Sequence, residues 1–311
     1  MAKPHLPAST CPLPILIAGP TAVGKSEIAL HLAEQLGGEI ISTDSMQVYR
    51  GLDIGTAKPS PADRARVPHH LIDLCDLTES FDAAQFVRLA QKTVAEIQAR
   101  GHAPVFCGGT GLYFKAFLGG LGEAPSAHPE LRAKLEAMPY EALLRELSER
   151  DAAAYEKIDK QNPRRVIRAV EVIRLTGKKF SQQRAEWKSA VQGQRPKFFC
   201  LTRATDDLRR RIDVRVDAMF ARGLVDETRE LLKRGLVENK TAMQAIGYRQ
   251  AVEHLRGERS LAETIERVKV KTRQFAKRQL TWFRAQKSLE WIELKPGEPL
   301  EDCIQKISEM V

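Results

Sequence analysis

The chain has 311 residues, enough to bury one large core or two modest ones. Its content of 43% hydrophobic and 29% charged residues is ordinary for a soluble globular protein. The formal charge of +9 suits a polyanionic partner, but many proteins without one carry as much, so charge alone does not decide for or against nucleic acid.

The cysteines and the N-terminal segment argue against a structural zinc site, a signal peptide and a membrane span. The five cysteines are scattered and form no C-x-x-C pair, which argues against a structural zinc site and fits a reducing, cytoplasmic compartment. The apolar run at 13–18 is too short for a signal peptide or a membrane span. We therefore expect a cytoplasmic protein without a membrane segment and, because no oligomer seam is evident, a monomer.

The first 120 residues alternate between strand and helix patterns. The expected elements, in chain order, are a buried strand at 13–18, a helix at 25–36, strands at 39–43 and 70–75, a helix from the Asp82 cap to about 101, and a strand at 103–107 that runs through a glycine turn into another helix. This rhythm predicts an α/β fold with a parallel sheet flanked by helices.

The second part of the chain is mainly helical. A glycine- and proline-rich stretch at 119–129 looks like a hinge, and helical patterns follow at 139–150, 162–176 and 180–188. A strand at 197–202, a long helix at about 260–287 and a short strand at 289–292 complete the pattern. The run GPTAVGKS at 19–26 fits the P-loop pattern, so we predict a P-loop core formed by 1–120 and 196–311, interrupted by a helical insertion domain at 121–195.

A phosphate-binding pattern directly follows the first strand. It reads G-x-x-x-x-G-K-S and comprises Gly19, Pro20, Thr21, Ala22, Val23, Gly24, Lys25 and Ser26. The glycines let successive N–H groups form an anion nest, Lys25 adds a full charge, and the Ser26 hydroxyl is suited to a Mg²⁺ ion that bridges phosphate oxygens. The pattern predicts a bound phosphate without saying whether it belongs to a nucleotide such as ATP.

The usual second carboxylate of a nucleotide hydrolase is missing from its expected place. The strand at 103–107 ends in Gly108, Gly109, Thr110 and Gly111, whereas Asp44 follows the strand at 39–43. This weakens a kinase or ATPase interpretation without excluding it, and it leaves Asp44 available as a base.

Six segments together resemble the tRNA dimethylallyltransferases, also called tRNA isopentenyltransferases. They are GPTAVGKS (19–26), STDSMQVYRGLDIGTAKP (42–59), VFCGGTGLYFKA (105–116), NPRRVIRAVEVIRLTGK (162–178), AIGYRQ (245–250) and TRQFAKRQLTWFR (272–284). Without the Cys/His set of a zinc finger, the chain is most similar to the shorter bacterial form. The resemblance implies transfer of a dimethylallyl group from dimethylallyl diphosphate to N6 of the adenosine directly 3′ of the anticodon (position 37), in tRNAs reading codons that begin with U.

The resemblance also implies roles for individual residues. The loop 19–26 would hold the diphosphate rather than ATP, with Lys25, Mg²⁺ and one of the pair Arg211 and Arg215 stabilising the leaving group. Asp44 would be the base that takes the proton of the adenine amine, and Ser45, Met46, Gln47 and Thr110 would line the adenosine pocket with it.

The predicted tRNA contacts outside this pocket lie mainly in the insertion. Arg164, Arg165 and Arg168 form a basic edge, and the family uses this segment, including Val166 and Ile167, for the anticodon stem-loop; Arg132 is a weaker candidate. The long C-terminal helix is also basic, so Arg278 and Arg284 either follow the tRNA backbone or point into the active site. Trp282 and Phe283 are expected to be core residues.

Two other functions remain open on the sequence. The chain could be a small-molecule kinase that uses ATP at the same loop, or an RNA-binding protein with a vestigial loop. The first predicts triphosphate turnover without RNA, and the second predicts tRNA binding that survives loss of Lys25.

Overall fold

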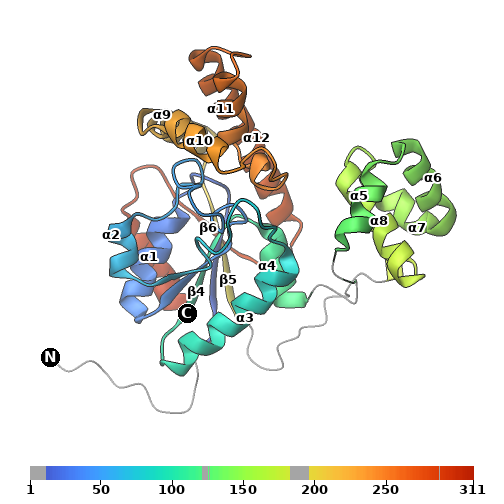
Figure 1. Ribbon diagram of the computed structural model, residues 1–311. Helices are drawn as coiled ribbons and strands as arrows, with labels where there is room; N and C mark the ends of the chain where they lie inside the picture. The colour runs from blue at the N-terminus through green and yellow to red at the C-terminus, as the bar shows by residue number, and fades with distance from the viewer. Residues whose placement is uncertain (1–11, 121–124, 126, 183–195, 287) are drawn as a thin grey trace. The chain divides into compact units, whose positions relative to one another are not determined.

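The computed structural model describes residues 12–120, 125, 127–182, 196–286 and 288–311 (Figure 1). The chain divides into two compact units, one formed by Met1–Phe114 with Gly193–Val311 and the other by Lys115–Gln192. We call them the core unit and the helical unit. The sequence analysis placed the corresponding boundaries at 120/121 and 195/196.

The core unit is built on a sheet that is parallel throughout its described pairs. The strand order is β3-β2-β4-β1-β5-β6. Their bounds are β1 Ile15–Ala18, β2 Glu39–Ser42, β3 His69–His70, β4 Pro104–Gly108, β5 Lys197–Thr202 and β6 Glu290–Glu293. All four residues of β1 and of β2 are buried, as expected for strands covered on both faces. The predicted α/β class with a parallel, helix-flanked sheet is confirmed.

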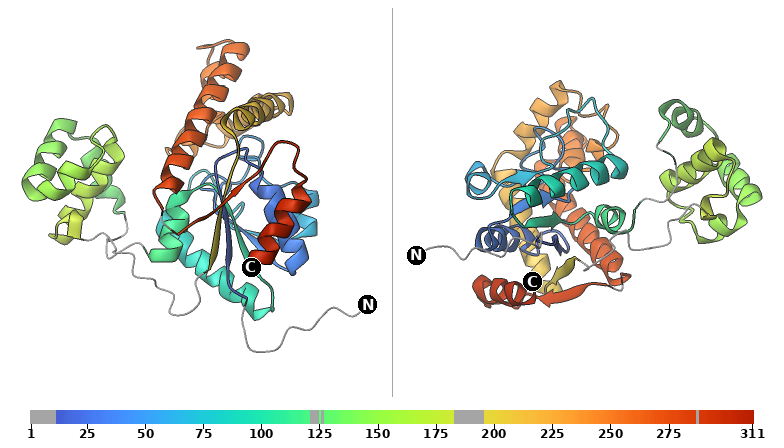
Figure 2. Two further views of the ribbon diagram at one scale, coloured as in Figure 1. Left: turned by 180° about the vertical axis from the view of Figure 1, so that it is seen from behind. Right: turned by 90° about the horizontal axis from the view of Figure 1, so that it is seen from below.

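Helices cover both faces of this sheet and its carboxyl edge. Helices α1 (Lys25–Leu36) and α13 (Leu300–Met310) lie side by side on one face, and α3 (Ala83–Ala99) and α4 (Gly111–Gly119) lie on the other (Figure 2). Beyond the carboxyl ends of the strands, α9 (Thr205–Ala221), α10 (Leu224–Lys233), α11 (Tyr248–Leu255) and α12 (Leu261–Arg284) pack on one another (Figure 1). This group of helices encloses the edge where parallel sheets bind ligands.

Local capping explains where several helices begin. Asp82 caps α3 as predicted, because its side chain accepts hydrogen bonds from the N–H groups of Ala84 and Gln85. Ser260 caps α12 in the same way, through the N–H of Glu263. The short helix α2 (Pro61–Arg66) lies between the strands expected at 39–43 and 70–75, where no element was predicted.

The predicted third strand is much shorter than expected. Only His69 and His70 pair with β2, and Cys75 forms an isolated bridge with Tyr49. Leu71 and Asp73 have φ angles of 61° and 55°, a left-handed conformation that ends the extended strand. The prediction of a strand over 70–75 was therefore wrong for most of its length.

The helical unit has a small core of its own. Its helices are α5 (Pro129–Glu136), α6 (Tyr140–Arg150), α7 (Ala152–Lys157), α8 (Pro163–Thr176) and the 3-10 turn η1 (Phe180–Gln182). Leu135, Leu143, Leu147, Val166 and Val170 form its buried centre. The predicted helices at 139–150 and 162–176 are confirmed within a residue. The predicted helix at 180–188 lies outside the described residues from 183 onward, as does part of the stretch 119–129.

No helix in the described part of the chain is both long enough and apolar enough to cross a membrane.

Candidate active site

The loop 19–26 connects β1 to α1 in a tight turn. Gly19 has a φ of 146°, and a Cβ there would lie 2.6 Å from the carbonyl oxygen of Leu201 on β5. Ala22 and Gly24 also have positive φ angles, of 64° and 111°. The Lys25 ammonium reaches back across the loop and donates to the carbonyl of Pro20 at 2.6 Å. This geometry concentrates N–H groups and the positive end of α1 in one place, which favours an anion.

Three charged side chains influence one another beside this loop. The pKa of the Lys25 ammonium falls to about 8, mainly because the side chain is buried; the nearby Arg215 guanidinium adds to the fall, and the Asp44 carboxylate opposes it. Burial also lowers the pKa of Arg215, again against the attraction of Asp44. The fold therefore brings together two cations and one carboxylate that are far apart in the sequence.

Asp44 is positioned by the meeting of two neighbouring strand ends. Its Oδ1 accepts a hydrogen bond from the N–H of Met46 at 2.9 Å. Beyond the end of β4, the N–H of Thr110 donates to the carbonyl of Thr43, and Thr110 Oγ1 accepts from the N–H of Ser45, both at 3.1 Å. Because β2 and β4 are adjacent and parallel, the predicted pocket residues 44–46 and Thr110 lie together.

Two cavities in the core unit meet at Asp44. The smaller one, the loop cavity, has a volume of about 80 Å³ and is lined by Lys25, Ser26 and Asp44 among others. The larger one, the wide cavity, has a volume of about 350 Å³ and is lined by Asp44 and Thr110, with residues of α9 and α12. The residues common to both linings are Thr21, Asp44, Thr56, Gly109, Arg215, Phe275 and Gln279. A ligand in the wide cavity would therefore contact Asp44, whose other neighbours, in the loop cavity, include Lys25 and Ser26 of the phosphate-binding loop.

The structure separates the two candidate arginines of α9. Arg215 is half-buried and lines both cavities, whereas Arg211 is exposed and donates through Nε to the carbonyl of Ala22 at 3.0 Å. Arg211 lines an outer hollow that also contains Lys25, Ser26 and Arg215. Arg215 is thus the member of the pair that reaches the inner site.

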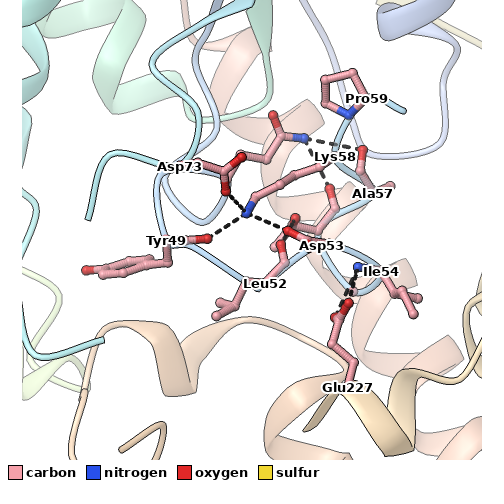
Figure 3. Close-up of polar contacts among 12 residues, drawn as sticks. Tyr49, Leu52, Asp53, Ile54, Ala57, Lys58, Pro59, Asp73 and Glu227 are labelled. Carbon is pink, nitrogen blue, oxygen red and sulfur yellow. Dashed lines mark hydrogen bonds and ion pairs between the residues drawn. The ribbon is translucent and has the colours of Figure 1, made fainter. Parts of the chain in front are cut away.

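The segment 52–59 contributes Thr56, Ala57 and Pro59 to the loop cavity and Gly55 and Thr56 to the wide cavity. It is held by polar contacts (Figure 3). Gln47 Nε2 donates to the carbonyls of Thr56 and Ala57 at 3.2 and 3.4 Å, while Gln47 Oε1 accepts from Ser42 Oγ at 2.8 Å. The ammonium of Lys58 is surrounded by oxygens of three chain segments. From the far side, Glu227 of α10 accepts the N–H of Ile54 at 3.0 Å. We call these contacts of Lys58 and Glu227 with segment 52–59 the clamp. They were not predicted from the sequence, because a lysine in a loop without periodicity gives no local signal.

Helix α12 also contributes side chains to the two cavities, and of these only Arg278 was singled out in the sequence analysis, as one of two arginines that could point into the active site. Phe275 and Gln279 line both cavities, and Arg278 lines the wide one. Arg284 lies instead in a separate groove with Arg209 and Lys277. Phe283 is fully buried and contacts Phe114, so it is a core residue as expected. Trp282 is half-buried, and it packs so closely on Gly111 that a Cβ there would lie 2.2 Å from its ring.

The predicted tRNA-binding residues of the helical unit have unequal exposure. Arg164 and Arg165 are exposed at the start of α8, and Ile167 is half-buried against the core of the unit. Val166 is fully buried, so its side chain packs on neighbouring helices and is not available to RNA.

Two further residues that were predicted to contact RNA, Arg132 and Arg168, form ion pairs within the helical unit. Arg132 and Arg168 both donate to Oε2 of the buried Glu171, at 2.6 and 2.8 Å. Burial alone would raise the pKa of Glu171, but these hydrogen bonds lower it. The structure therefore gives Arg132 and Arg168 a role in neutralising a buried carboxylate, and their contact with RNA stays a prediction.

The chain is similar in sequence to one family of proteins over most of its length. Residues 47–286 match the family model described as IPP transferase. A Trichlorobacter lovleyi protein named tRNA dimethylallyltransferase 1 is 46% identical over 285 residues, covering 90% of this chain and 93% of the relative. A tRNA dimethylallyltransferase of Halorhodospira halophila is 49% identical over 280 residues, covering 88% and 90%.

Two solved structures agree with these sequence matches. A tRNA isopentenylpyrophosphate transferase from Bacillus halodurans superposes with a TM-score of 0.71 at 40% identity, covering 96% of this chain and 95% of its own. A eukaryotic dimethylallyltransferase acting on tRNA gives a TM-score of 0.80 at 27% identity, covering 95% and 77%. The resemblance seen in the sequence is confirmed, and the chain belongs to the IPP transferase family.

Proposed function

We propose that this protein is a tRNA dimethylallyltransferase that acts on N6 of the adenosine directly 3′ of the anticodon. The observation that carries this proposal is the pair of adjoining cavities with Lys25 at one, Thr110 at the other and Asp44 in their common lining. The names of the relatives agree with it and do not favour a kinase. In the reaction, the allylic C–O bond breaks, a C–N bond forms, and diphosphate leaves.

The diphosphate end of the site is rich in groups that stabilise negative charge. Charge builds on the bridging oxygen as the allylic bond breaks, and we assign its stabilisation to Lys25, Arg215 and the N–H groups of the loop 19–26 other than that of Thr21, which donates to Gln279. Because these groups are fixed by the fold before the substrate arrives, they need little reorganisation during the reaction.

A magnesium ion fits this end of the site only with the help of its substrate. In the part of the chain that the structure describes, no cluster of three His, Cys, Asp or Glu side chains could hold a metal. The exposed hydroxyl of Ser26, next to Lys25 at the start of α1, supplies one oxygen ligand of the type Mg²⁺ prefers. The remaining ligands would be diphosphate oxygens and water. When bound, the ion supplies additional charge stabilisation to the leaving group.

The acceptor end must take an adenine that has left the anticodon stack. Its exocyclic amine is a poor nucleophile until it loses a proton, so a base within hydrogen-bond reach accelerates the attack. Asp44 lines the wide cavity, and Met46 fixes one carboxylate oxygen through its N–H. We assign the proton transfer to Asp44 and the lining of the adenosine pocket to Ser45, Met46 and Thr110, which line the wide cavity. Gln47, the fourth residue predicted for this pocket, lines the adjoining loop cavity instead.

The RNA itself is a large polyanion, and exposed arginines suit its phosphates. We propose that Arg164 and Arg165 contact the anticodon stem-loop. The described cysteines Cys75, Cys107, Cys200 and Cys303 are free thiols, which supports a reducing compartment such as the cytoplasm.

The central experiment incubates the protein with labelled dimethylallyl diphosphate, Mg²⁺ and unmodified tRNA. Label should enter the RNA, and the variant Asp44→Asn should bind tRNA normally while transferring about 10²–10⁴-fold more slowly, the range for loss of a general base. Asp206→Asn is the control, since that carboxylate is 89% exposed on α9. Near-normal turnover by Asp44→Asn would overturn the assignment of the base.

The competing functions give different results in the same experiment. A kinase would hydrolyse or transfer the γ-phosphate of ATP without RNA, and it would not label tRNA. A binding protein with a vestigial loop would retain tRNA affinity in Lys25→Ala and would show no transfer in the unmodified protein.

A further inference from the structure

Gln279 of α12 connects two parts of the site that no local sequence pattern links. Its side-chain Oε1 accepts a hydrogen bond from the N–H of Thr21 in the phosphate-binding loop, at 2.8 Å. Its Nε2 donates to the carbonyl of Gly109 at the end of β4, at 3.0 Å. The residue is 7% exposed, so both hydrogen bonds form away from bulk water.

The backbone around Gln279 is fitted closely to this amide. A Cβ at Gly109 would lie 2.2 Å from Gln279 Nε2, so any other residue there would displace the amide. Gln279, Thr21 and Gly109 all belong to the common lining of the two cavities. The amide therefore stands between the loop cavity and the wide cavity rather than in a distant part of the core.

A continuous series of contacts leads from Gln279 to Asp44. Gly109 is followed directly by Thr110, whose N–H donates to the carbonyl of Thr43 and whose Oγ1 accepts from the N–H of Ser45. Thr43 and Ser45 flank Asp44 in the chain. One side chain of α12 thus links the loop to the strand end that holds Asp44, in addition to the pairing of β1, β4 and β2 in the sheet.

We propose that Gln279 is a positioning residue that sets the spacing between the diphosphate-binding loop and Asp44. This inference rests on the proposed function and deepens it. Attack on the allylic carbon needs the amine nitrogen and the leaving oxygen on opposite sides of that carbon, with the base within hydrogen-bond reach of the amine proton. A misplacement of about 1 Å in such a geometry is enough to slow a reaction about 10²-fold.

Three variants test the role of the amide. Gln279→Leu removes both hydrogen bonds, Gln279→Glu keeps an acceptor for Thr21 but places a carboxylate oxygen against the Gly109 carbonyl, and Gly109→Ala displaces the amide from the other side. The control is Gln85→Leu, which removes a comparable hydrogen bond, from the N–H of Asp82 to Gln85 Oε1, in the cap of α3.

The readouts separate positioning from general stability. We expect kcat at saturating dimethylallyl diphosphate and tRNA to fall about 10²-fold in Gln279→Leu, with tRNA affinity unchanged and affinity for inorganic pyrophosphate weakened. Gln279→Glu and Gly109→Ala should lower kcat as well, whereas Gln85→Leu should lower only the melting temperature. Normal kcat in folded Gln279→Leu, or an equal fall in Gln85→Leu, would overturn the inference.

Hydrogen exchange distinguishes failure of this inference from failure of the proposed function. In Gln279→Leu the amide of Thr21 loses its acceptor and should exchange faster than in the unmodified protein. If the unmodified protein transfers no label, the proposed function is wrong. Faster exchange at Thr21 and weaker pyrophosphate binding in Gln279→Leu would still show that the two hydrogen bonds of Gln279 hold the loop in place. Unchanged exchange at Thr21 in Gln279→Leu would reject the positioning role of Gln279 even if the enzyme is active.

Discussion

Replacing Lys58 by methionine should destabilise the core unit strongly, although Lys58 lies in a loop. Its side chain is 2% exposed, and the ammonium donates to the carbonyl of Tyr49 at 2.6 Å and to carboxylate oxygens of Asp53 and Asp73 at 2.8 and 2.5 Å (Figure 3). Methionine keeps the length of the stem and removes the charge and all three donors. Three chain segments thereby lose their common partner.

The expected size of the effect follows from what each partner does afterwards. Asp73 keeps its ion pair with Arg64 at 2.8 Å, and Asp53, which is 57% exposed, can be hydrated. The Tyr49 carbonyl keeps only the longer hydrogen bond from the N–H of Leu52, at 3.4 Å. Breaking a fully buried ion pair costs about 3–5 kcal/mol, so we expect a smaller loss of about 2–3 kcal/mol. For a protein of this size that lowers the melting temperature by about 4–12 °C.

Thermal and urea unfolding of Lys58→Met measure this loss directly. The matched control is Lys92→Met, since Lys92 is 74% exposed and pairs only at 3.8 Å with Glu96. We also expect a higher KM for tRNA, because segment 52–59 supplies the carbonyls that hold Gln47. If both lysine variants unfold at the same temperature, the clamp does not stabilise the protein and our reasoning about it is wrong.

Three further predictions concern charge. Since burial lowers the pKa of Lys25 to about 8, affinity for inorganic pyrophosphate should weaken as pH rises through about 8, and calorimetry should find this step missing in Lys25→Arg. Burial alone would raise the pKa of Glu39, but hydrogen bonds from Arg100, His102 and His70 lower it to about 2. Ionised Glu39 therefore stabilises the folded protein above about pH 4.5, and this contribution to the free energy of unfolding is lost as pH falls towards 2. Acid unfolding of Glu39→Gln should lack this pH-dependent loss. An acid-unfolding profile unchanged by the substitution would contradict the prediction. Arg165→Ala should reduce the salt dependence of tRNA binding by about one phosphate contact, as measured by titration at several salt concentrations, whereas an unchanged slope would remove Arg165 from the interface.

Local sequence patterns were sufficient for much of the scaffold. Apolar runs and helical spacing identified β1, α1, α3 and α8 because their burial repeats along the chain, and Asp82 marked a helix start because a cap acts on its own first turn. The pattern 19–26 located the anion-binding loop, and Asp44 could be singled out because it directly follows a buried strand. The family resemblance added roles that the patterns alone leave open.

Tertiary structure decided which side chains meet. Gln279 lies 258 positions from Thr21 and 170 from Gly109, and neither separation leaves a trace in local periodicity. The same holds for Phe275, and for the clamp of Lys58 and Glu227 on segment 52–59. Spacing of four placed Arg211 and Arg215 on one helix, but only the packing of α9 over the strand ends put Arg215 inside and Arg211 outside. Periodicity reports how each element divides its own faces between core and solvent, whereas a reaction centre depends on where several elements come together in the folded chain.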